Sequence, residues 1–393
     1  MPLSASCVTL RHVGGECVID PLAPEAELGR IRADIDEVDR QIQTLLNRRA
    51  ECAQRVAEVK RAELLASGAG GTVRGQPTFY RPEREAQVLR SVMERNTGPL
   101  PAEEVAHIFR EIMSACLALE RPVRVAFLGP EGTFTQAAAL KHFGHAVHSS
   151  ALGTIGAVFE DVEAGNVDYG VVPVENSTEG MVTHTLDNFI RSPLKICGEV
   201  EMPIRLHLLA APGATAGGIR RICAHQQALA QCRGWLEKHW PGVEQAAVSS
   251  NGEAARLAAL DASIAAVAGD IAREGHGLAS LASNIQDYAD NTTRFLVIGR
   301  EGARPSGRDK TSIIASTHNR PGALFRLLEP FQREQVMLTR IDTRPSRTET
   351  WTYLFFIEFE GHQEDPRIAA VLREIQEQTV MIKILGSYPQ AVL

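Results

Sequence analysis

The longest hydrophobic pattern in the chain runs from Leu28 to Val59. Apolar residues recur there at alternating spacings of three and four, which predicts one amphipathic helix from Pro24 to about Ala66. Such a helix is ~60 Å long at ~1.5 Å per residue, so its apolar line needs a partner, and we expect an intertwined helical dimer. The line is interrupted by Arg49, whose guanidinium is costly to bury unless an anion pairs with it.

Two shorter helices are expected after Pro82 and after Pro101, beyond a glycine-rich loop over 67–77. The first carries Glu85 on its apolar stripe. The stripe of the second consists of Val105, Phe109, Ile112 and Cys116, and its next position holds Glu120. A single charge of this kind is usually a snorkelling or paired structural group. Together with the arginine of the long helix, the two charges instead favour a polar pocket for an anion.

Strands and helices alternate between about residues 123 and 300. The segment 123–130 predicts a strand followed by a helix from about Thr135, and 167–176 predicts a second strand that ends at Asn176. This alternation indicates an α/β fold, which binds ligands at the carboxyl ends of its strands. The hydroxyl and amide groups there suit a carboxylate ligand, although ordinary turns and helix caps use the same residues.

The last part of the chain, 310–393, follows a linker at 300–309 and predicts a different module. Its apolar pattern gives the order β-α-β-β-α-β, with helices over about 321–335 and 365–378. This order is typical of a ferredoxin-like α+β fold.

Composition narrows the classes of protein further. The 393 residues have a formal charge of −7, which argues against a general nucleic-acid binder, and no apolar run is long enough for a membrane span. The start of the chain lacks the features of a signal peptide, and seven cysteines in no regular framework suit reduced thiols, so we expect a cytoplasmic protein.

Neither a metal nor a cofactor is expected. Cys223, His225 and Cys232 have the spacing of a partial metal site, but no second ligand pair follows, which favours a role in the core. The glycine patterns of dinucleotide-binding folds and of P-loops are also missing from the sequence.

Four motifs of the middle region resemble prephenate dehydratases: VAFLGPEGTFT (125–135), VPVENSTEG (172–180), CAHQQALAQC (223–232) and NTTRF (291–295). From about residue 28 to its end the chain is similar to the bifunctional chorismate mutase–prephenate dehydratases, which end in an ACT regulatory domain. The resemblance implies an all-α helical chorismate mutase bundle at 24–121, forming an intertwined dimer. It further implies a two-lobed α/β dehydratase domain at 122–300 and a ferredoxin-like ACT domain at 310–393, and leaves 1–23 as an extension of unknown role.

The resemblance also implies a chorismate mutase site, made of Arg32, Arg49, Lys60, Arg84, Glu85 and Glu120. The arginines at 32, 49 and 84 would face the two carboxylates of chorismate, the first of them reaching over from the other subunit. The lysine and Glu120 would flank the ether oxygen, and Glu85 would contact a hydroxyl. Arg81 stands where enteric relatives carry an aspartate, and Glu120 stands where they carry glutamine.

For the dehydratase, the resemblance implies three catalytic candidates, Asn176, Gln231 and Thr293. Substrate contacts are expected from a second group of residues in the same motifs: Thr133, Ser177, Thr178, His225, Gln227, Arg294 and Phe295. His-Gln-Gln replaces the commoner His-Pro-Gln at 225–227, which leaves the contact made by Gln227 open.

In the ACT region, the motifs PGALF (321–325) and DTRP (342–345) resemble the pair that binds phenylalanine between two subunits. The implied effector contacts are Gly322, Ala323, Leu324, Asp342, Thr343, Arg344 and Pro345. Asp342 and Thr343 replace the usual Glu-Ser pair conservatively.

The sequence therefore predicts a cytoplasmic, cofactor-free homodimer or larger homo-oligomer that acts on chorismate and prephenate, with phenylalanine as its effector. Three alternatives stay open. The middle region could be a ligand sensor without chemistry, because two-lobed solute-binding proteins share its architecture. A mutase joined to a prephenate dehydrogenase would need the missing nicotinamide motif. Finally, the helical part could be a dimerisation element that has lost its chemistry.

Overall fold

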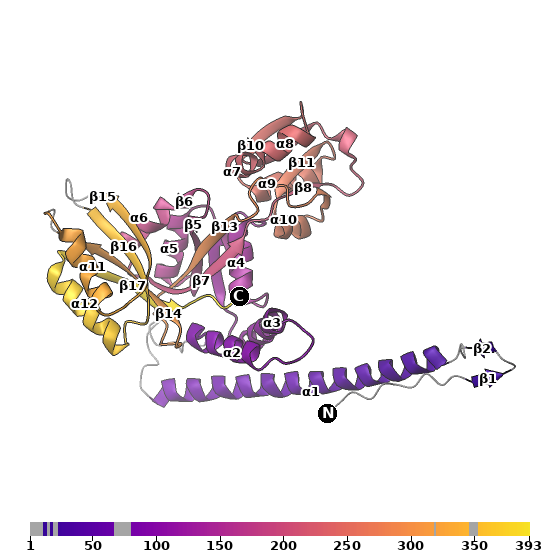
Figure 1. Ribbon diagram of the computed structural model, residues 1–393, viewed down its shortest axis with the longest axis horizontal. Helices are drawn as coiled ribbons and strands as arrows, with labels where there is room; N and C mark the ends of the chain where they lie inside the picture. Colours follow the sequence, from indigo (N-terminus) through magenta and orange to yellow (C-terminus); the bar gives the residue numbers. More distant parts are fainter. Residues whose placement is uncertain (1–10, 14–15, 19–22, 67–79, 318–319, 346–352) are drawn as a thin grey trace. The chain divides into compact units, whose positions relative to one another are not determined.

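The computed structural model describes residues 11–13, 16–18, 23–66, 80–317, 320–345 and 353–393 (Figure 1). The chain divides into two compact units, 1–75 and 76–393, each of which is described by itself. The glycine-rich loop at 67–77 and most of the first 23 residues lie outside the described residues. No helix within the described ranges is long and apolar enough to cross a membrane.

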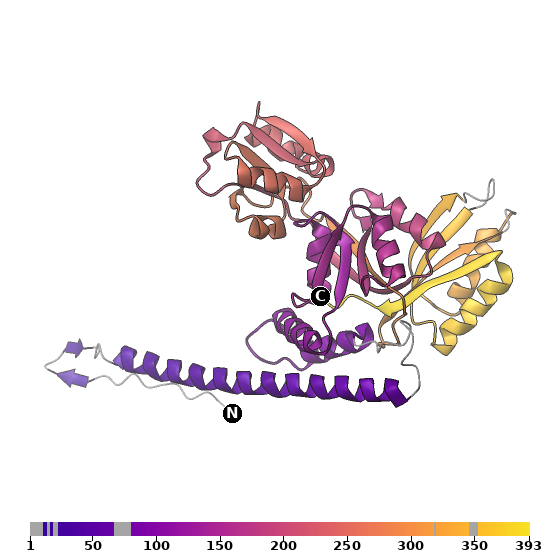
Figure 2. The ribbon, with the colours of Figure 1, turned by 180° about the vertical axis from the view of Figure 1, so that it is seen from behind.

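The first unit contains a short antiparallel hairpin and one long helix. The hairpin pairs β1 (Arg11–Val13) with β2 (Glu16–Val18), and α1 (Ala23–Ala66) runs for 44 residues without interruption, as predicted (Figure 2). Large apolar side chains of the expected line, from Leu28 to Val59, are 47% to 63% exposed. An apolar line of this length left open in a single chain is typical of a surface that another molecule covers.

The second unit begins with α2 (Pro82–Glu94) and α3 (Ala102–Glu120), which start where the two prolines predict. The buried line of α3 differs from the expected one. Ala106, Arg110 and Ser114 are buried. Of the predicted stripe only Cys116 is buried, and its other members are half-buried. The reason is a contact that the sequence pattern does not encode, because Arg110 donates a hydrogen bond of 2.7 Å to the carbonyl of Lys141 in the next domain.

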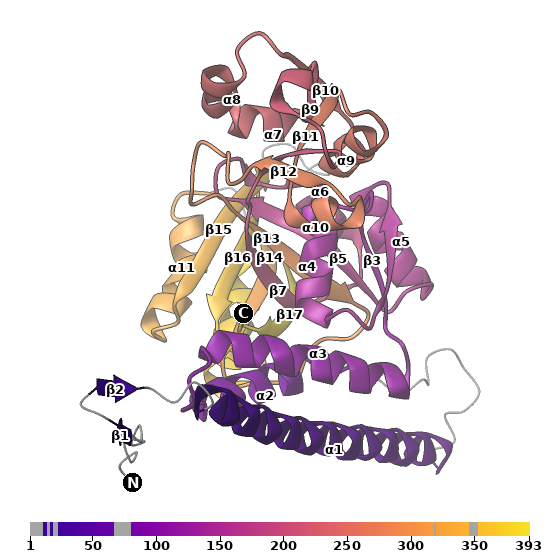
Figure 3. The same ribbon diagram turned by 90° about the vertical axis from the view of Figure 1, so that its right-hand side faces the viewer.

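A six-stranded mixed sheet follows. Its order is β4-β3-β5-β13-β7, with β6 paired to β5; β3 is parallel to β4 and β5, whereas β13 is antiparallel to both of its neighbours. The helix α4 covers one face (Figure 3), and α5 and α6 pack on the other. The bounds are β3 (Arg124–Leu128), α4 (Phe134–Phe143), β4 (His148–Leu152), α5 (Ile155–Ala164), β5 (Tyr169–Asn176), β6 (Gly180–Met181), α6 (Thr183–Arg191), β7 (Lys195–Pro203) and β13 (Thr292–Gly299).

A five-stranded sheet of order β10-β9-β11-β8-β12 forms the second lobe. It is inserted between β7 and β13, so the chain leaves the first sheet and returns to its centre. This arrangement confirms the predicted two-lobed α/β fold. The bounds are β8 (His207–Ala210), the 3-10 turn η2 (Ala216–Gly218), β9 (Arg221–His225), α7 (Gln226–Gln231), α8 (Arg233–His239), β10 (Glu244–Val248), α9 (Asn251–Leu260), β11 (Ile264–Ala268), α10 (Asp270–Gly275) and β12 (Ala279–Ala282).

The last sheet is antiparallel, in the order β15-β16-β14-β17, and confirms the ferredoxin-like prediction. One face packs on α11 and α12. The other face contributes Phe356, Leu385 and Tyr388 to the same apolar cluster as Val172 and Leu296 of the six-stranded sheet. The bounds are β14 (Asp309–Ser316), α11 (Ala323–Arg333), β15 (Leu338–Pro345), β16 (Tyr353–Glu360), α12 (Pro366–Gln378) and β17 (Met381–Pro389).

The two stacked sheets touch backbone to backbone at Gly386. A Cβ atom there would lie 2.3 Å from the carbonyl oxygen of Ile196. We therefore expect Gly386→Ala to lower the free energy of unfolding by about 1–3 kcal/mol, the usual cost of overpacking. Chemical denaturation measures the change, and Gly302→Ala is the matched control because a Cβ at Gly302 meets nothing within 4 Å. Equal unfolding midpoints for the two variants would contradict the contact.

Candidate active sites

The ends of β5 and β13 bring the predicted dehydratase residues together. Thr293 is paired with Asn176 and Arg294 with Glu175, but the next pairing, Phe295 with Pro173, leaves one residue of β5 without a partner. Such a bulge interrupts the alternation of side chains along β5. As a result Asn176 lies on the same face as Thr293, and its Nδ2 donates a hydrogen bond of 2.8 Å to the threonine Oγ1.

Asn176 is the centre of a local hydrogen-bond network. Its Nδ2 also donates to Asn291 Oδ1 at 2.8 Å, and its Oδ1 accepts from the backbone and hydroxyl of Thr178 at 3.0 and 2.6 Å. The side chain is only 6% exposed. A buried amide that makes this many bonds has one fixed orientation, so it holds its neighbours in place. Ser177 and Thr178, which follow directly, are exposed.

Close backbone contacts bring Thr133 to the second lobe. A Cβ at Gly252, in the first turn of α9, would lie 2.2 Å from the carbonyl oxygen of Glu131. The preceding residue, Asn251, accepts a hydrogen bond of 2.9 Å from the backbone of His225. The loop that carries Thr133 and the strand that ends in His225 therefore meet at the same junction between the lobes. The sequence analysis missed Asn251 and Gly252, which mark this contact.

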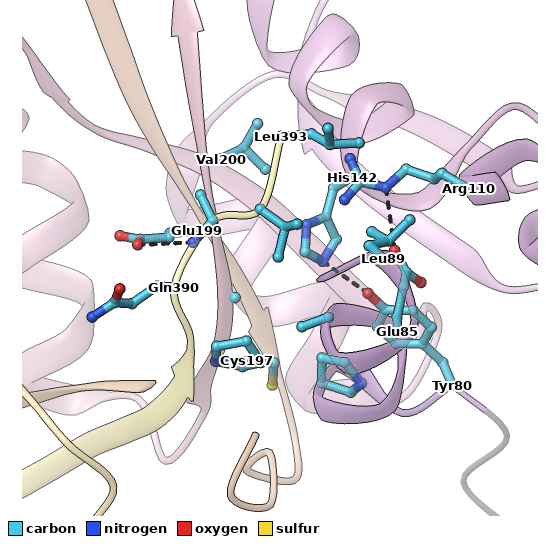
Figure 4. Close-up of a pocket in the computed structure, with 16 residues that line it drawn as sticks. Tyr80, Glu85, Leu89, Arg110, His142, Cys197, Glu199, Val200, Gln390 and Leu393 are labelled. Atoms are coloured by element: carbon cyan, nitrogen blue, oxygen red, sulfur yellow. Dashed lines mark hydrogen bonds and ion pairs between the residues drawn. The ribbon is translucent and has the colours of Figure 1, made fainter. Parts of the chain in front are cut away.

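A separate pocket lies between α2, α3, β7 and the end of the chain (Figure 4). Glu85 Oε1 lies 3.3 Å from Arg110 Nε, and the Tyr80 hydroxyl shares a hydrogen bond of 2.9 Å with His142 Nε2. Burial raises the pKa of Glu85 to about 7, against the opposing effect of Arg110. Burial, with the nearby guanidinium charge, lowers the pKa of His142 to about 3, so the imidazole is neutral.

Three family models match the chain in succession. They describe chorismate mutase type II over residues 31–121, prephenate dehydratase over 125–303 and the ACT domain over 311–377. A bifunctional chorismate mutase/prephenate dehydratase from Pseudomonas aeruginosa is 54% identical over 372 residues, which cover 95% of this chain and 100% of the relative. The chain belongs to this bifunctional family. It is an enzyme of phenylalanine biosynthesis with chorismate mutase and prephenate dehydratase activities.

Solved structures resemble the dehydratase and ACT parts. A prephenate dehydratase from Arthrobacter aurescens, described in complex with L-Phe, is 36% identical with a TM-score of 0.63, over 68% of this chain and 90% of that one. A structure described as GqqA, a novel type of quorum quenching acylase, has the same TM-score at 28% identity, over 68% of this chain and 98% of that one. A shared fold does not fix an activity, so the assignment here rests on the full-length relative.

The predicted mutase residues are divided between the two compact units. Arg32, Arg49 and Lys60 lie on α1, the first exposed and the other two half-buried. Arg84 is exposed on α2, whereas Glu85 and Glu120 are half-buried. The sequence analysis missed Arg110 and Tyr80, the neighbours of Glu85. Arg110 is the residue directly after Phe109 and therefore lies beside the predicted apolar stripe. Its burial follows from its contact with the dehydratase domain, which the sequence pattern does not predict.

Two expected substrate contacts of the dehydratase, Arg294 and Phe295, lie in the interior of the structure. Arg294 is 5% exposed and donates hydrogen bonds to Glu199 at 3.0 Å and to Glu358 at 2.6 Å. Phe295 is 2% exposed and belongs to the core beneath α4. Both side chains are interior groups, because strand residues that follow Thr293 are packed within the sheet, and their substrate contacts stay predictions.

The α7 residues lie in the second lobe. Gln227 donates its backbone N–H to His225 Nδ1 at 3.3 Å, which caps the helix, and Gln231 is half-buried at its end. The backbone carbonyl of Gln231 accepts from Asp287, in the segment that leads back to the first lobe. No hydrogen bond described by the structure joins the α7 glutamines to Asn176, so their catalytic and substrate-binding roles stay predictions.

Cys223 and Cys232 are both buried and belong to different apolar clusters. Within the described ranges, no three His, Cys, Asp or Glu side chains are grouped as a metal site would require.

Glu85 gives the stability of the protein a dependence on pH. Its pKa is about 7 in the folded chain and about 4.5 when unperturbed, so its contribution to stability is complete below pH ~4.5 and is lost as the pH rises through about 7. The side chain of Glu85→Gln stays neutral at every pH. As the pH rises from ~5 to ~8, the free energy of unfolding of this variant should therefore increase by up to ~3 kcal/mol relative to that of the parent. Denaturation at both pH values measures this, with Glu94→Gln on the exposed face of α2 as control. A constant difference would contradict the burial of the carboxyl.

Proposed function

We propose that prephenate reacts at the ends of β5 and β13, where the Thr293 hydroxyl assists loss of the ring hydroxyl. The observation that carries this proposal is the bond from Asn176 Nδ2 to Thr293 Oγ1. Because the threonine oxygen accepts this bond, its own proton is available to a ligand. Carbon dioxide and the ring hydroxyl leave together, and the hydroxyl takes up a proton to become water. Formation of the aromatic ring drives the reaction, so the protein need only bind the carboxylates and stabilise the leaving oxygen.

The mutase reaction requires different groups. Chorismate rearranges to prephenate in one concerted step, so catalysis consists of holding a compact dianion and stabilising the charge that develops on the ether oxygen. We propose that Arg49 and Arg84, with Arg32 of the other subunit, bind the carboxylates, since guanidinium groups form paired bonds to them. In this proposal Lys60 and Glu120 flank the ether oxygen and Glu85 contacts a hydroxyl. The exposed apolar line of α1 supports the dimer that the site requires.

For regulation, we propose that phenylalanine binds at Gly322, Ala323 and Leu324 of one ACT domain and at 342–345 of another. Support comes from the motifs and from the relative described in complex with L-Phe. Gly322 has a φ of 75° at the start of α11, and the β15 segment lies at the edge of its sheet, where a second copy has access. The division into 24–121, 122–300 and 310–393 and a cytoplasmic location belong to the same proposal.

Phenylpyruvate formation, started separately from chorismate and from prephenate, tests the whole assignment. The proposal expects product from both substrates and less product when phenylalanine is present. Product from prephenate alone would identify the helical part as a dimerisation element. No product from either substrate would favour a sensor without chemistry.

Replacement of the Thr293 hydroxyl tests the dehydratase site. Thr293→Val should lower kcat for prephenate by about 10²–10³-fold, the usual effect of removing one donor to a developing oxyanion. Thr293→Ser keeps the hydroxyl and should retain most of the turnover. Steady-state kinetics on prephenate gives both values. If the valine variant kept the turnover of the parent, another group would have to assist the leaving hydroxyl.

Glu120 makes the mutase reaction sensitive to pH. A carboxylate repels negative charge on the ether oxygen, whereas a protonated carboxyl donates a hydrogen bond to it. The mutase rate should therefore fall toward alkaline pH, and Glu120→Gln should flatten that fall while the dehydratase rate stays unchanged. A pH–rate profile with chorismate decides this, because identical profiles for the parent and the variant would remove Glu120 from the site.

A further inference from the structure

Six charged side chains meet where the dehydratase sheet stacks on the ACT sheet. From the dehydratase come Glu175 on β5, Glu199 on β7 and Arg294 on β13. The ACT sheet supplies Lys310 on β14, Arg340 on β15 and Glu358 on β16. We call these six side chains the ionic cluster. With three carboxylates and three cations, its charges balance.

Direct bonds join the two domains within the cluster. Arg294 donates to Glu199 at 3.0 Å and to Glu358 at 2.6 Å, and Lys310 donates to Glu199 at 2.7 Å. Arg340 forms an ion pair with Glu175. Each cation from one domain therefore has a carboxylate of the other domain as a partner, so movement of the ACT sheet acts directly on the strands of the dehydratase.

Burial makes these pairs costly to disturb. Glu199, Arg294 and Glu358 are 4%, 5% and 7% exposed. Burial alone raises the pKa of Glu358, but Arg294 and Arg340 outweigh it and hold the pKa below the usual range. The Glu358 carboxyl is therefore ionised, and removal of a charged partner from this buried group is costly.

Two members of the cluster are sequence neighbours of the proposed catalytic pair. Glu175 precedes Asn176, and Arg294 follows Thr293. Successive residues of a strand point to opposite faces, so the threonine hydroxyl and the Arg294 guanidinium lie on opposite sides of one backbone. The bulge in β5 likewise places Glu175 on the face of the ACT sheet and Asn176 on the other face. The ionic cluster thus holds both strand ends from the face toward the ACT sheet, opposite Asn176 and Thr293.

Not every contact within the ionic cluster is a hydrogen bond. Two of its contacts, Arg340 Nε to Glu358 Oε2 at 3.7 Å and Arg294 Nε to Glu175 Oε2 at 4.0 Å, are too long for hydrogen bonds. A small, mainly apolar cavity next to them is lined by Val174 and Leu296 as well as by Arg340 and Glu358.

We propose that Arg340 and Glu358 of the ACT domain are positioning residues for the dehydratase reaction. Through Glu175 and Arg294 they hold Asn176 and Thr293 in the arrangement that assists loss of the ring hydroxyl. The inference rests on the proposed site at those two residues. It makes the ACT sheet part of the dehydratase framework even when no effector is bound.

Three variants test the positioning role: Glu358→Gln, Arg340→Gln and the double variant Arg340→Gln with Glu175→Gln. Each single change should lower kcat for prephenate at least fivefold with KM changed less than twofold, because substrate contacts stay intact. The double variant should lose no more kcat than Arg340→Gln alone, because its second change removes the other partner of the same Arg340–Glu175 ion pair. Mutase turnover of chorismate by the same preparations should stay at the level of the parent.

The matched control is Glu374→Gln. It breaks the ion pair between Arg333 on α11 and Glu374 on α12, the helices that pack on the face of the ACT sheet away from the dehydratase, and should leave kcat unchanged. Thermal unfolding of every variant separates positioning from stability. If Glu358→Gln does not fold, Arg340→Gln provides the test. Arg340 is only half-buried, whereas Glu358 is fully buried, so the arginine variant disturbs the fold less.

A kcat for prephenate equal to that of the parent in folded Arg340→Gln would overturn the inference. An equal fall in mutase turnover would do the same, since it would indicate general damage. Thr293→Val serves as the reference: if it is impaired while the cluster variants are normal, only the positioning role fails. If Thr293→Val is normal, the proposed site fails and the positioning role fails with it.

Discussion

The antiparallel pairing of β5 with β13 is the constraint on which the dehydratase half of the molecule depends. The second lobe is inserted between β7 and β13, so β13 must return to the centre of the first sheet before the domain is complete. Its first residues then meet the last residues of β5, and one bulge sets Asn176 against Thr293. A polar site is thereby built from segments more than a hundred residues apart, on strands too well packed to move independently.

The same two strand ends face the ACT sheet on their other side. There the ionic cluster, with Arg294 at its centre, lies beside the apolar packing between the two sheets. Buried ion pairs contribute little net stability compared with apolar packing, so their value lies in specifying one arrangement of two surfaces. Direct bonds therefore join the ACT domain to the ends of β5 and β13, and Arg110 joins α3 to α4 by a hydrogen bond.

Local patterns were sufficient to predict the helix that ends at Ala66, the strand that ends at Asn176 and the order of elements in the ACT domain, because each is determined by neighbours in the sequence. The roles of Arg294 and Arg110 could not be predicted in this way. Their partners, Glu358 for one and the backbone carbonyl of Lys141 for the other, belong to a neighbouring domain, and no periodicity encodes a contact between two domains. The sequence pattern around each arginine does not predict its buried partner. Only the fold shows that these side chains form interior contacts.

A crystal structure of the full chain with phenylpyruvate, the product of the dehydratase, tests the central claim most directly. The account predicts that the product lies on the α4 side of the six-stranded sheet, within about 3 Å of Thr293 Oγ1 and beside Thr178. Product bound away from the ends of β5 and β13, or on the face that stacks against the ACT sheet, would contradict it.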